Sequence, residues 1–420
     1  MVFTMKKSAN KSYTIFISSI LIFIITLSLT YLWFRESRTE ISRQIYFKQE
    51  LDMVSLTDAI NNFTLLIYGS IAKDHFSKNL VVSPFNIYVA LLMLYEGTNS
   101  ATKKELGSVL GIYDSDACTV YRDLISKLPL GGDNDTRLYL ANGAWLRNSF
   151  PFKESYVNKI RSCYQGDISY FANTKELIKE VNEWVKERTR GLIKEFLVGV
   201  PDDTVAVLVS AIYLYALWLE EFKPSTPIMF WTGEKYVEAN AMEVKGSHLK
   251  VVESDNYLAV EIPYRGSNLS MVVIMPKDFR ETLANHRNLI LEALKRLDAT
   301  ENRGATLRMP KFEFEFKSSV KENLKSLGVR EVFLPGVADL RGMADVPRGA
   351  IWVDDVIHQA IIKVNEKGTE AAAATAIIIV TALVPVTVIE INKPFIFIIR
   401  DRDTGVILFI GHVVDPTLRS

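Results

Sequence analysis

Residues 364–376 read Val-Asn-Glu-Lys-Gly-Thr-Glu-Ala-Ala-Ala-Ala-Thr-Ala, and the β-branched run 377–381 follows directly. Alanines favour a helix, whereas β-branched residues favour a strand. With the two-residue period of a strand, Thr369 and every second residue up to Ile379 share one face, and Glu370 lies on the other. Small residues followed by strand formers suit a strand that must slide between two existing strands. A solvent-exposed loop or short helix with no special role is the alternative.

The order of residues in this stretch is similar to that of a known family. Glu366-Lys367-Gly368-Thr369 followed by alanines resembles the proximal hinge of the serpin reactive-centre loop, and residues 391–397 and 408–416 resemble the closing strands of that family. Further blocks in the family's order extend the resemblance back to about residue 52. The hinge residues that the resemblance implies are Glu366, Gly368, Thr369, Ala371, Ala372, Ala373 and Ala374.

The resemblance implies an α+β serpin fold, with a large central mixed sheet, two smaller sheets, about eight or nine helices and an exposed reactive-centre loop. The serpin domain would cover residues 51–420 and the loop about residues 366–388. The residue patterns agree. Apolar residues at helical spacing predict a helix over 52–72, Pro84 suits a first helical turn, and 259–276 has the pattern of a hairpin.

Composition limits the classes of function. The chain has 420 residues, of which 48% are hydrophobic, enough for one large domain or two ordinary ones. Its 49 basic and 49 acidic residues cancel, so no net field favours nucleic acid. The five histidines lack the spacing of a zinc site, and we expect neither a metal nor a cofactor. The two cysteines, Cys118 and Cys163, are too few for a disulfide framework; two unpaired thiols are favoured over a single bridge.

The N-terminal segment differs in kind from the rest. No charged residue occurs from Ser12 to Phe34, a length that crosses a hydrocarbon core of about 30 Å as a helix. Lysines precede this run and charges of both signs follow it, which places residues 1–11 in the cytoplasm. We expect a transmembrane signal anchor at 12–34, a stalk at 35–50, and a single-pass protein of the cell membrane with an extracellular serpin domain. A cleaved signal peptide and a secreted protein are the alternative, although no small-residue cleavage site follows.

Export would make three N-glycosylation sequons relevant, at Asn62, Asn134 and Asn268. Asn268 lies in a strand-like run, which disfavours its modification. In either reading of the N-terminal segment, the bulk of the chain lies outside the cytoplasm and is expected to be a monomer.

The sequence does not indicate an enzyme. It contains no nucleophile elbow, no metalloprotease motif, no phosphate-binding loop and no dinucleotide fingerprint. Ser83 could be read as a nucleophile with His358 as its base. However, Ser83 stands at a strand–helix junction in an apolar neighbourhood, where a buried hydrogen-bonded pair is the favoured reading.

The resemblance assigns these residues to a polar cluster beneath the central strands of the main sheet, which controls how easily the strands part. Asn86 stands where the family usually has a serine, and Ser210 where it usually has an asparagine, so an amide and a hydroxyl are exchanged across the cluster. Trp218 matches a tryptophan at the end of the sheet where loop insertion begins. The sheet-opening residues are Ser83, Pro84, Asn86, Ser210, His358 and Trp218.

By resemblance, a serine protease attacks the exposed loop, forms an ester, and is trapped when the freed hinge inserts into the sheet as a new strand. Counting from Gly368 places the scissile residue at Ala382, whereas counting back from Asn392 places it at Leu383. No basic residue occurs in residues 380–384, so the resemblance predicts an inhibitor of elastase-like or chymotrypsin-like proteases. A non-inhibitory serpin that acts as a carrier or chaperone is the alternative.

Overall fold

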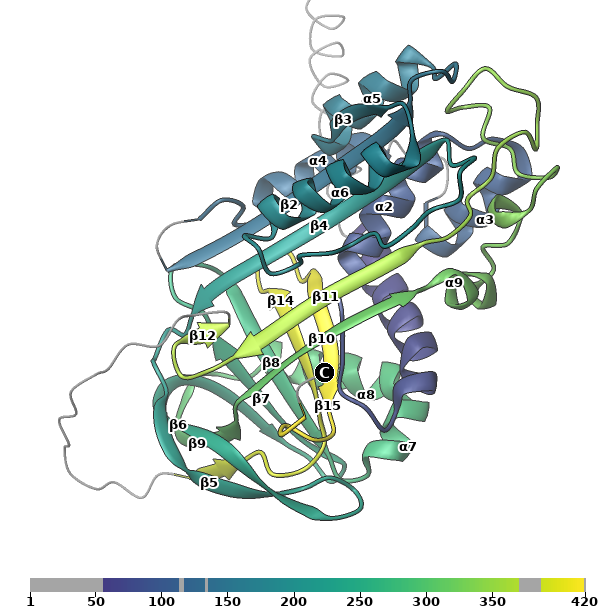
Figure 1. Ribbon diagram of the computed structural model, residues 1–420. Helices are drawn as coiled ribbons and strands as arrows, with labels where there is room; N and C mark the ends of the chain where they lie inside the picture. Colours follow the sequence, from purple (N-terminus) through teal and green to yellow (C-terminus); the bar gives the residue numbers. More distant parts are fainter. Residues whose placement is uncertain (1–55, 113–116, 133–134, 370–386, 419–420) are drawn as a thin grey trace, which may run out of the picture. The chain divides into compact units, whose positions relative to one another are not determined.

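The computed structural model describes residues 56–112, 117–132, 135–369 and 387–418. Residues 56–418 combine two β-sheets with nine α-helices in the described part of the chain, which confirms the predicted α+β class (Figure 1). The first described residues form a helix over 56–75, close to the prediction of 52–72. The predicted anchor 12–34 and stalk 35–50 lie outside the described residues. Within the described residues, no helix is both long and apolar enough to cross a membrane.

A six-stranded sheet, here called the main sheet, forms one layer of the structure. Its strands lie in the order β10, β11, β12, β4, β2, β3, and only the pair β2–β3 is parallel, so the sheet is mixed as predicted. The bounds are β10 Phe312–Ser319, β11 Ile357–Val364, β12 Gly368–Thr369, β4 Ala206–Leu217, β2 Thr136–Arg147 and β3 Asp167–Phe171.

The other nine strands form a second sheet, in two parts that share one long strand, β6. Its first part pairs with β5 and β9, and its last part, Lys250–Glu253, pairs with β7. The two smaller sheets that the resemblance implied are therefore continuous, and the nine strands form one hydrogen-bonded sheet through β6. Their bounds are β1 Leu80–Val82, β5 Lys223–Trp231, β6 Tyr236–Glu253, β7 Tyr257–Pro263, β8 Leu269–Pro276, β9 Arg303–Pro310, β13 Val388–Glu390, β14 Phe395–Asp401 and β15 Ile407–Val413.

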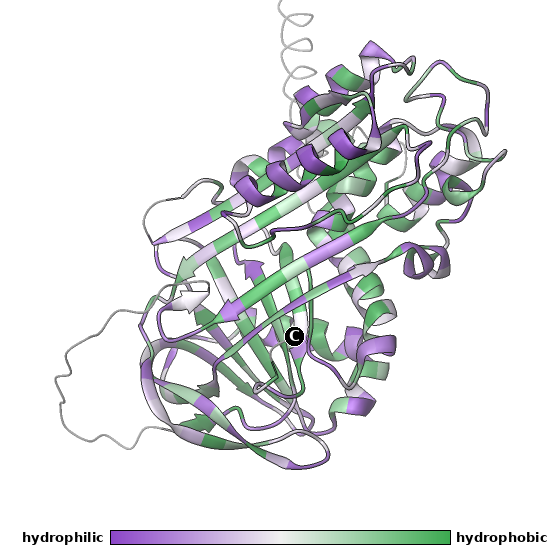
Figure 2. Ribbon diagram, in the orientation of Figure 1, coloured by the Kyte–Doolittle hydropathy of each residue, from purple (hydrophilic) through white to green (hydrophobic). Residues whose placement is uncertain are grey.

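Helix α2 lies inside the fold, between the main sheet and strand β15. It begins at Pro84, where proline has no amide that a helix start would leave unpaired. Ten of its thirteen residues are buried, consistent with contacts to both β4 and β15. Hydrophobic residues dominate α2, β14 and β15 in Figure 2. After the first helix, the helices are α2 Pro84–Glu96, α3 Ser100–Leu110, α4 Ala117–Lys127, α5 Glu154–Tyr164, α6 Thr174–Arg188, α7 Phe279–Ala284, α8 His286–Asp298 and α9 Lys321–Leu327.

Helix α6 crosses the outer face of the main sheet (Figure 1). The side chain of Asn173 caps its start by accepting a hydrogen bond from the amide of Glu176 at 3.0 Å. Val181 and Val185 lie on its buried stripe, while its outer face is hydrophilic (Figure 2). The helix ends at Arg188, and the chain then returns across the sheet toward β4.

Cys118 of α4 and Cys163 of α5 form a disulfide, so the prediction of two unpaired thiols is wrong. The two helices pack against each other, although the cysteines are 45 residues apart in the sequence. A separation of 45 residues in the sequence does not indicate which helices pack together. In the described part of the chain, no cysteine is free.

The three predicted glycosylation sequons differ in setting. Asn62 lies half-buried within the first helix, and the hydroxyl-bearing Thr64 of its sequon is fully buried. Asn268 is exposed in the turn between β7 and β8, where its amide donates to a carboxylate oxygen of Asp403. Asn134 lies outside the described residues.

Candidate functional site: the hinge and the gap in the main sheet

The chain reverses sharply between β11 and β12, and one short segment after β4 anchors this reversal. The backbone amide of Trp218 donates to the carbonyl of Lys367 at 2.8 Å, and its indole Nε1 donates to the carbonyl of Asn365 at 2.9 Å. The amide of Phe222 donates to the carbonyl of Glu366 at 2.9 Å. Each of the three carbonyls of the reversal therefore has a partner in this segment.

Gly368 and Thr369, near the start of the predicted loop, are seated inside the main sheet instead of being exposed. Gly368 pairs with Leu217 and Thr369 pairs with Ala216, while Thr369 also pairs with Val364 of β11. Both Gly368 and Thr369 are buried. A Cβ at position 368 would lie 1.9 Å from the carbonyl oxygen of Ala216, so only glycine fits there.

Thr369 is held by a side chain as well as by the sheet. Its hydroxyl lies 2.6 Å from the hydroxyl of Tyr264, and the ring of Tyr264 stacks on Trp218 with centroids 4.6 Å apart. Burial raises the pKa of Tyr264, so its hydroxyl keeps its proton. On the other side of the reversal, the carboxylate of Glu366 forms an ion pair with Lys311 at 2.9 Å.

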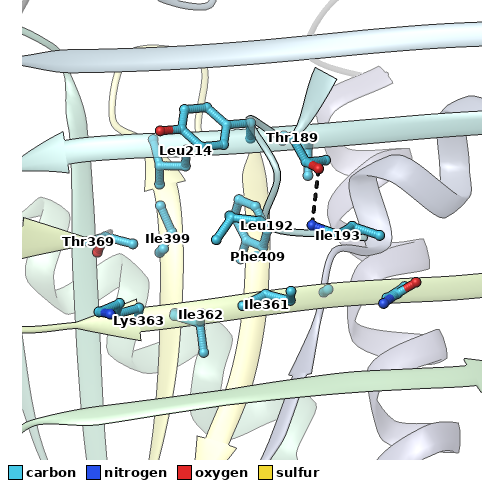
Figure 3. A pocket seen from close by; sticks show the side chains of 14 residues that line it. Thr189, Leu192, Ile193, Leu214, Ile361, Ile362, Lys363, Thr369, Ile399 and Phe409 are labelled. Carbon is cyan, nitrogen blue, oxygen red and sulfur yellow. Dashed lines mark hydrogen bonds between the residues drawn. The ribbon is translucent and has the colours of Figure 1, made fainter. Parts of the chain in front are cut away.

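An apolar gap continues the line of β12 between β4 and β11. In the described part of the chain, no residue beyond Thr369 pairs with either edge of this gap. Figure 3 shows side chains from three sources between the two strands. They are Leu192 and Ile193 from the segment after α6, Ile399 from β14, and Phe409 from β15. The amide of Ile193 donates to the hydroxyl of Thr189 at 3.2 Å, which fixes this covering segment.

The opposite end of the gap meets a buried polar cluster. The hydroxyl of Ser83 donates to the carbonyl of Leu408 at 2.8 Å, and the amide of Ser83 donates to Nε2 of His358 at 3.1 Å. Complete burial lowers the pKa of His358 to about 3, so the imidazole is neutral and can accept this hydrogen bond. The hydroxyl of Ser83 donates to a main-chain carbonyl, and the imidazole accepts from the amide of Ser83, so the pair holds α2 to β11 and β15.

The exchanged pair, Asn86 and Ser210, is in direct contact. The amide nitrogen of Asn86 donates to the carbonyl of Ser210, and the hydroxyl of Ser210 donates to Oδ1 of Asn86, both at 3.4 Å. These bonds join α2 to β4. Because His358 lies on β11 and Ser210 on β4, the cluster holds the two strands that border the gap.

The structure thus brings Ser83, Pro84, Asn86, Ser210 and His358 together and leaves Trp218 apart. Trp218 is eight residues from Ser210, which corresponds to roughly 26 Å along an extended strand. The predicted residues accordingly occupy both ends of the gap, Trp218 beside the hinge and the polar cluster at the far end. The hinge alanines Ala371, Ala372, Ala373 and Ala374 and the predicted reactive bond at Ala382 or Leu383 lie outside the described residues.

Three residues of the site were not predicted from the sequence: Tyr264, Lys311 and Leu192. Tyr264 belongs to the predicted hairpin, Lys311 stands between β9 and β10, and Leu192 follows α6. None has a local pattern that distinguishes it from an ordinary core or surface residue. Among the residues that the structure describes, no group of acidic, histidine or cysteine side chains could hold a metal ion.

The resemblance to the serpins implied a hinge that enters this sheet after cleavage, and the structure has Gly368 and Thr369 of that hinge already paired there. A family model described as Serpin (serine protease inhibitor) matches residues 58–416. The chain belongs to the serpin family. Serpins inhibit proteases rather than catalyse reactions, so at the level of the family this serpin is a protease inhibitor and not an enzyme.

Similar proteins agree with this assignment over most of their length. The chain is 31% identical to an uncharacterized serpin-like protein of Thermococcus kodakarensis over 388 residues, covering 86% of each chain. It is 31% identical to leukocyte elastase inhibitor A of Rattus norvegicus over 387 residues, covering 87% of this serpin and 100% of the relative. The structure of human glycosylated kallistatin is similar with a TM-score of 0.76 and 25% identity, covering 88% of this serpin and 98% of that chain.

Proposed function

We propose that this serpin is a suicide-substrate inhibitor of elastase-like or chymotrypsin-like serine proteases. The protease would cleave the loop and form an acyl-enzyme, and insertion of the freed hinge would carry the trapped protease along. One observation carries the proposal: Gly368 and Thr369 already form a strand between β11 and β4, and the gap continues beyond them.

The register of the seated residues predicts where the following residues would go. Continued by one residue at a time, it places Ala371 opposite Leu214 and Ala373 opposite Ile212, while Thr375 falls opposite Ser210 of the polar cluster. On the β11 side, the same register places Thr375 opposite His358. A hydroxyl would therefore arrive beside the polar cluster at the far end of the gap.

The size of the loop residues suits the gap. Alanine side chains would fit between β4 and β11 above Ile399 and Phe409 without displacing the strands far. The larger Ile377 and Ile379 would follow on the same face, and burial of two isoleucine side chains contributes on the order of 3–6 kcal/mol. The inserted strand would also complete the main-chain hydrogen bonds of both borders, so insertion releases free energy stored in the uncleaved state.

Specificity follows from the residues around the proposed cut. Ala382 fits a small primary pocket and Leu383 an apolar one, and neither suits a pocket that selects arginine or lysine. The 31% identical leukocyte elastase inhibitor A supports a small or apolar primary residue. Efficient inhibition of trypsin without inhibition of elastase would contradict this part of the proposal.

We also propose that the serpin domain is exported and held at the membrane by residues 12–34. The uncharged run supports an anchor, and the disulfide between Cys118 and Cys163 supports an oxidising compartment. Labelling of intact cells with a membrane-impermeant reagent would test this topology, since an extracellular domain is labelled and a cytoplasmic one is protected.

The test of inhibition is incubation of the full-length chain with elastase and, separately, with chymotrypsin. We expect a protease complex that survives boiling in detergent, release of a C-terminal peptide that begins after Ala382 or Leu383, and a rise in thermal stability of the cleaved serpin. Cleavage without a complex and without a gain in stability would indicate a non-inhibitory serpin.

A further inference from the structure

An exposed apolar patch lies on the hairpin formed by β5 and β6. Met229 is 57% exposed and Tyr236 is 63% exposed, and the half-buried ring of Trp231 lies 5.0 Å from that of Tyr236. Met229 and Trp231 alternate with the buried Ile228 and Phe230, so both point away from the core. These three residues, Met229, Trp231 and Tyr236, are here called the hairpin patch.

The residues of the hairpin patch lie next to one another on the surface. Trp231 pairs directly with Tyr236, and Met229 pairs with Glu238, so the three side chains are neighbours on a two-stranded ribbon. Single exposed hydrophobic residues need no explanation, but contiguous ones with an aromatic pair are typical of an interaction surface.

The hairpin patch is connected to the C-terminal base of the reactive loop. The amide of Trp231 donates to the carbonyl of Asn392 at 2.9 Å, and Asn392 follows β13 by two residues. The exposed Val388 begins β13. Trp231 is therefore hydrogen-bonded to the chain only four residues from the point where the loop rejoins the fold.

The length of the loop brings an attacking protease to this side of the serpin. Leu383 lies five positions before Val388, so a cut before or after Leu383 lies at most about 20 Å from Val388. The other end of the loop, Thr369, is thirteen residues from Ala382. A protease domain of roughly 200 residues has a radius of gyration of about 16 Å, so a protease that grips the bond reaches well beyond the loop base.

We propose that the hairpin patch is a second contact surface for the protease that attacks the loop. This proposal rests on the proposed function only in taking the loop as the site of attack. The exposed carboxylates of Glu234 and Glu238 flank the patch, with the single cation Lys235 between them. The fitting partner surface is an apolar or aromatic rim beside the protease active-site cleft that also carries arginine or lysine.

The test compares three full-length proteins for binding to elastase and to chymotrypsin whose catalytic serine is replaced by alanine. They are the unchanged serpin, the variant with Met229→Ser and Tyr236→Ser, and a control with Leu334→Ser and Val337→Ser. The control residues are also exposed, at 45% and 36%, and follow α9, which lies far from β5 in Figure 1. An inactive protease reports docking whether or not the loop inserts.

We expect the hairpin variant to weaken binding about 10-fold and the control to leave it unchanged. With active protease, the rate constant for complex formation would fall by the same factor while the number of serpin molecules consumed per protease stays constant. Equal affinity of all three proteins would overturn the proposal. So would a dimer of the serpin that the hairpin variant abolishes, because the patch would then be filled by a second copy. Absence of a covalent complex with active protease would contradict the inhibitory function alone, since docking is measured separately.

Discussion

The hydroxyl groups of Tyr264 and Thr369 lie 2.6 Å apart inside the end of the main sheet. The two residues are 105 positions apart in the sequence. Their contact holds the side chain of Thr369 against Tyr264, whose ring is itself stacked on Trp218. The position of the hinge is therefore determined by a buried side-chain hydrogen bond as well as by the two strands beside it.

Replacement of Tyr264 by phenylalanine would remove this hydroxyl and keep the ring stack. The hydroxyl of Thr369 would lose a buried partner. The free energy that favours the hinge in the sheet over the released hinge would fall by about 1–2 kcal/mol. We expect faster amide hydrogen exchange in residues 364–369, measured by mass spectrometry. Tyr170→Phe, at a position that is 50% exposed, is the matched control and should leave that exchange unchanged. Equal protection of the hinge in both variants would contradict the role of Tyr264.

Replacement of Thr369 by arginine would place a long charged side chain where the present one is 5% exposed. An unpaired buried charge is too costly to keep, so the hinge would leave the sheet and insertion would fail at its first step. We expect cleavage of the loop by elastase without a covalent complex, visible on denaturing gels. Thr369→Ser retains the hydroxyl and should still form the complex. An arginine variant that inhibits as well as the serine variant would exclude insertion through this position.

The contact between Asn86 and Ser210 predicts coupling between the two positions. Asn86→Ser leaves a short side chain opposite a serine, and Ser210→Asn places two amides in one space, so each single change should lower the free energy of unfolding by about 1–2 kcal/mol. The double variant restores one amide and one hydroxyl and should recover most of that loss. Urea unfolding of all four proteins measures the coupling. Additive losses in the double variant would show that the two side chains act independently.

Acid should destabilise the fold through His358. Its pKa is about 3 in the folded protein and near 6.5 when unfolded, so between these values only the unfolded chain binds the proton. Stability is thus unaffected above pH 6.5 and falls as the pH drops below it, by about 1.4 kcal/mol per pH unit. Urea unfolding at pH 7.5 and pH 5 measures the change, to which His412, with a pKa of about 4, adds in the same direction.

The share of His358 is the difference between the unchanged serpin and His358→Gln. The glutamine variant should be less stable at pH 7.5 but should lose less stability on acidification. An identical loss in both proteins would assign the acid sensitivity to other groups.

Removal of the disulfide between Cys118 and Cys163 should cost about 3–4 kcal/mol, because the bond closes a loop with a sequence separation of 45 residues. The measurement is the unfolding free energy of the variant with both cysteines replaced by alanine. Thiol titration in denaturant is the direct check and should find no reactive thiol before reduction and two after it. Two thiols before reduction would contradict the pairing.

Much of the fold follows from local residue patterns. The start of α2 at Pro84 and the hairpin of β7 and β8 were predicted because each depends on spacing within a few residues. The residues of the polar cluster were predicted from the resemblance to the serpins. Its geometry, with a hydrogen bond from the amide of Ser83 to His358, required the structure because α2 and β11 are far apart in the chain.

The seating of the hinge could not be predicted in the same way. An alanine run has no side-chain preference that shows which residue enters the sheet first, and both glycine and threonine occur freely in loops. The seat depends on Tyr264 and on the carbonyl of Ala216, which come from distant strands. The disulfide was predicted wrongly for a related reason, since only the packing of α4 on α5 brings its two sulfur atoms together.

The pairing of β1 with β15 has a consequence for synthesis of the chain. Leu80 pairs with His412, and the hydroxyl of Tyr68 lies 2.9 Å from Nδ1 of His412, across 344 residues of sequence. At a translation rate of about 5–20 residues per second, the first helix waits roughly 20–70 s for its partner strand. The ribosome must also release that strand before it can pair. The N-terminal part of the domain therefore leaves the ribosome without its final neighbours, and the native core closes only after the last strand has been made.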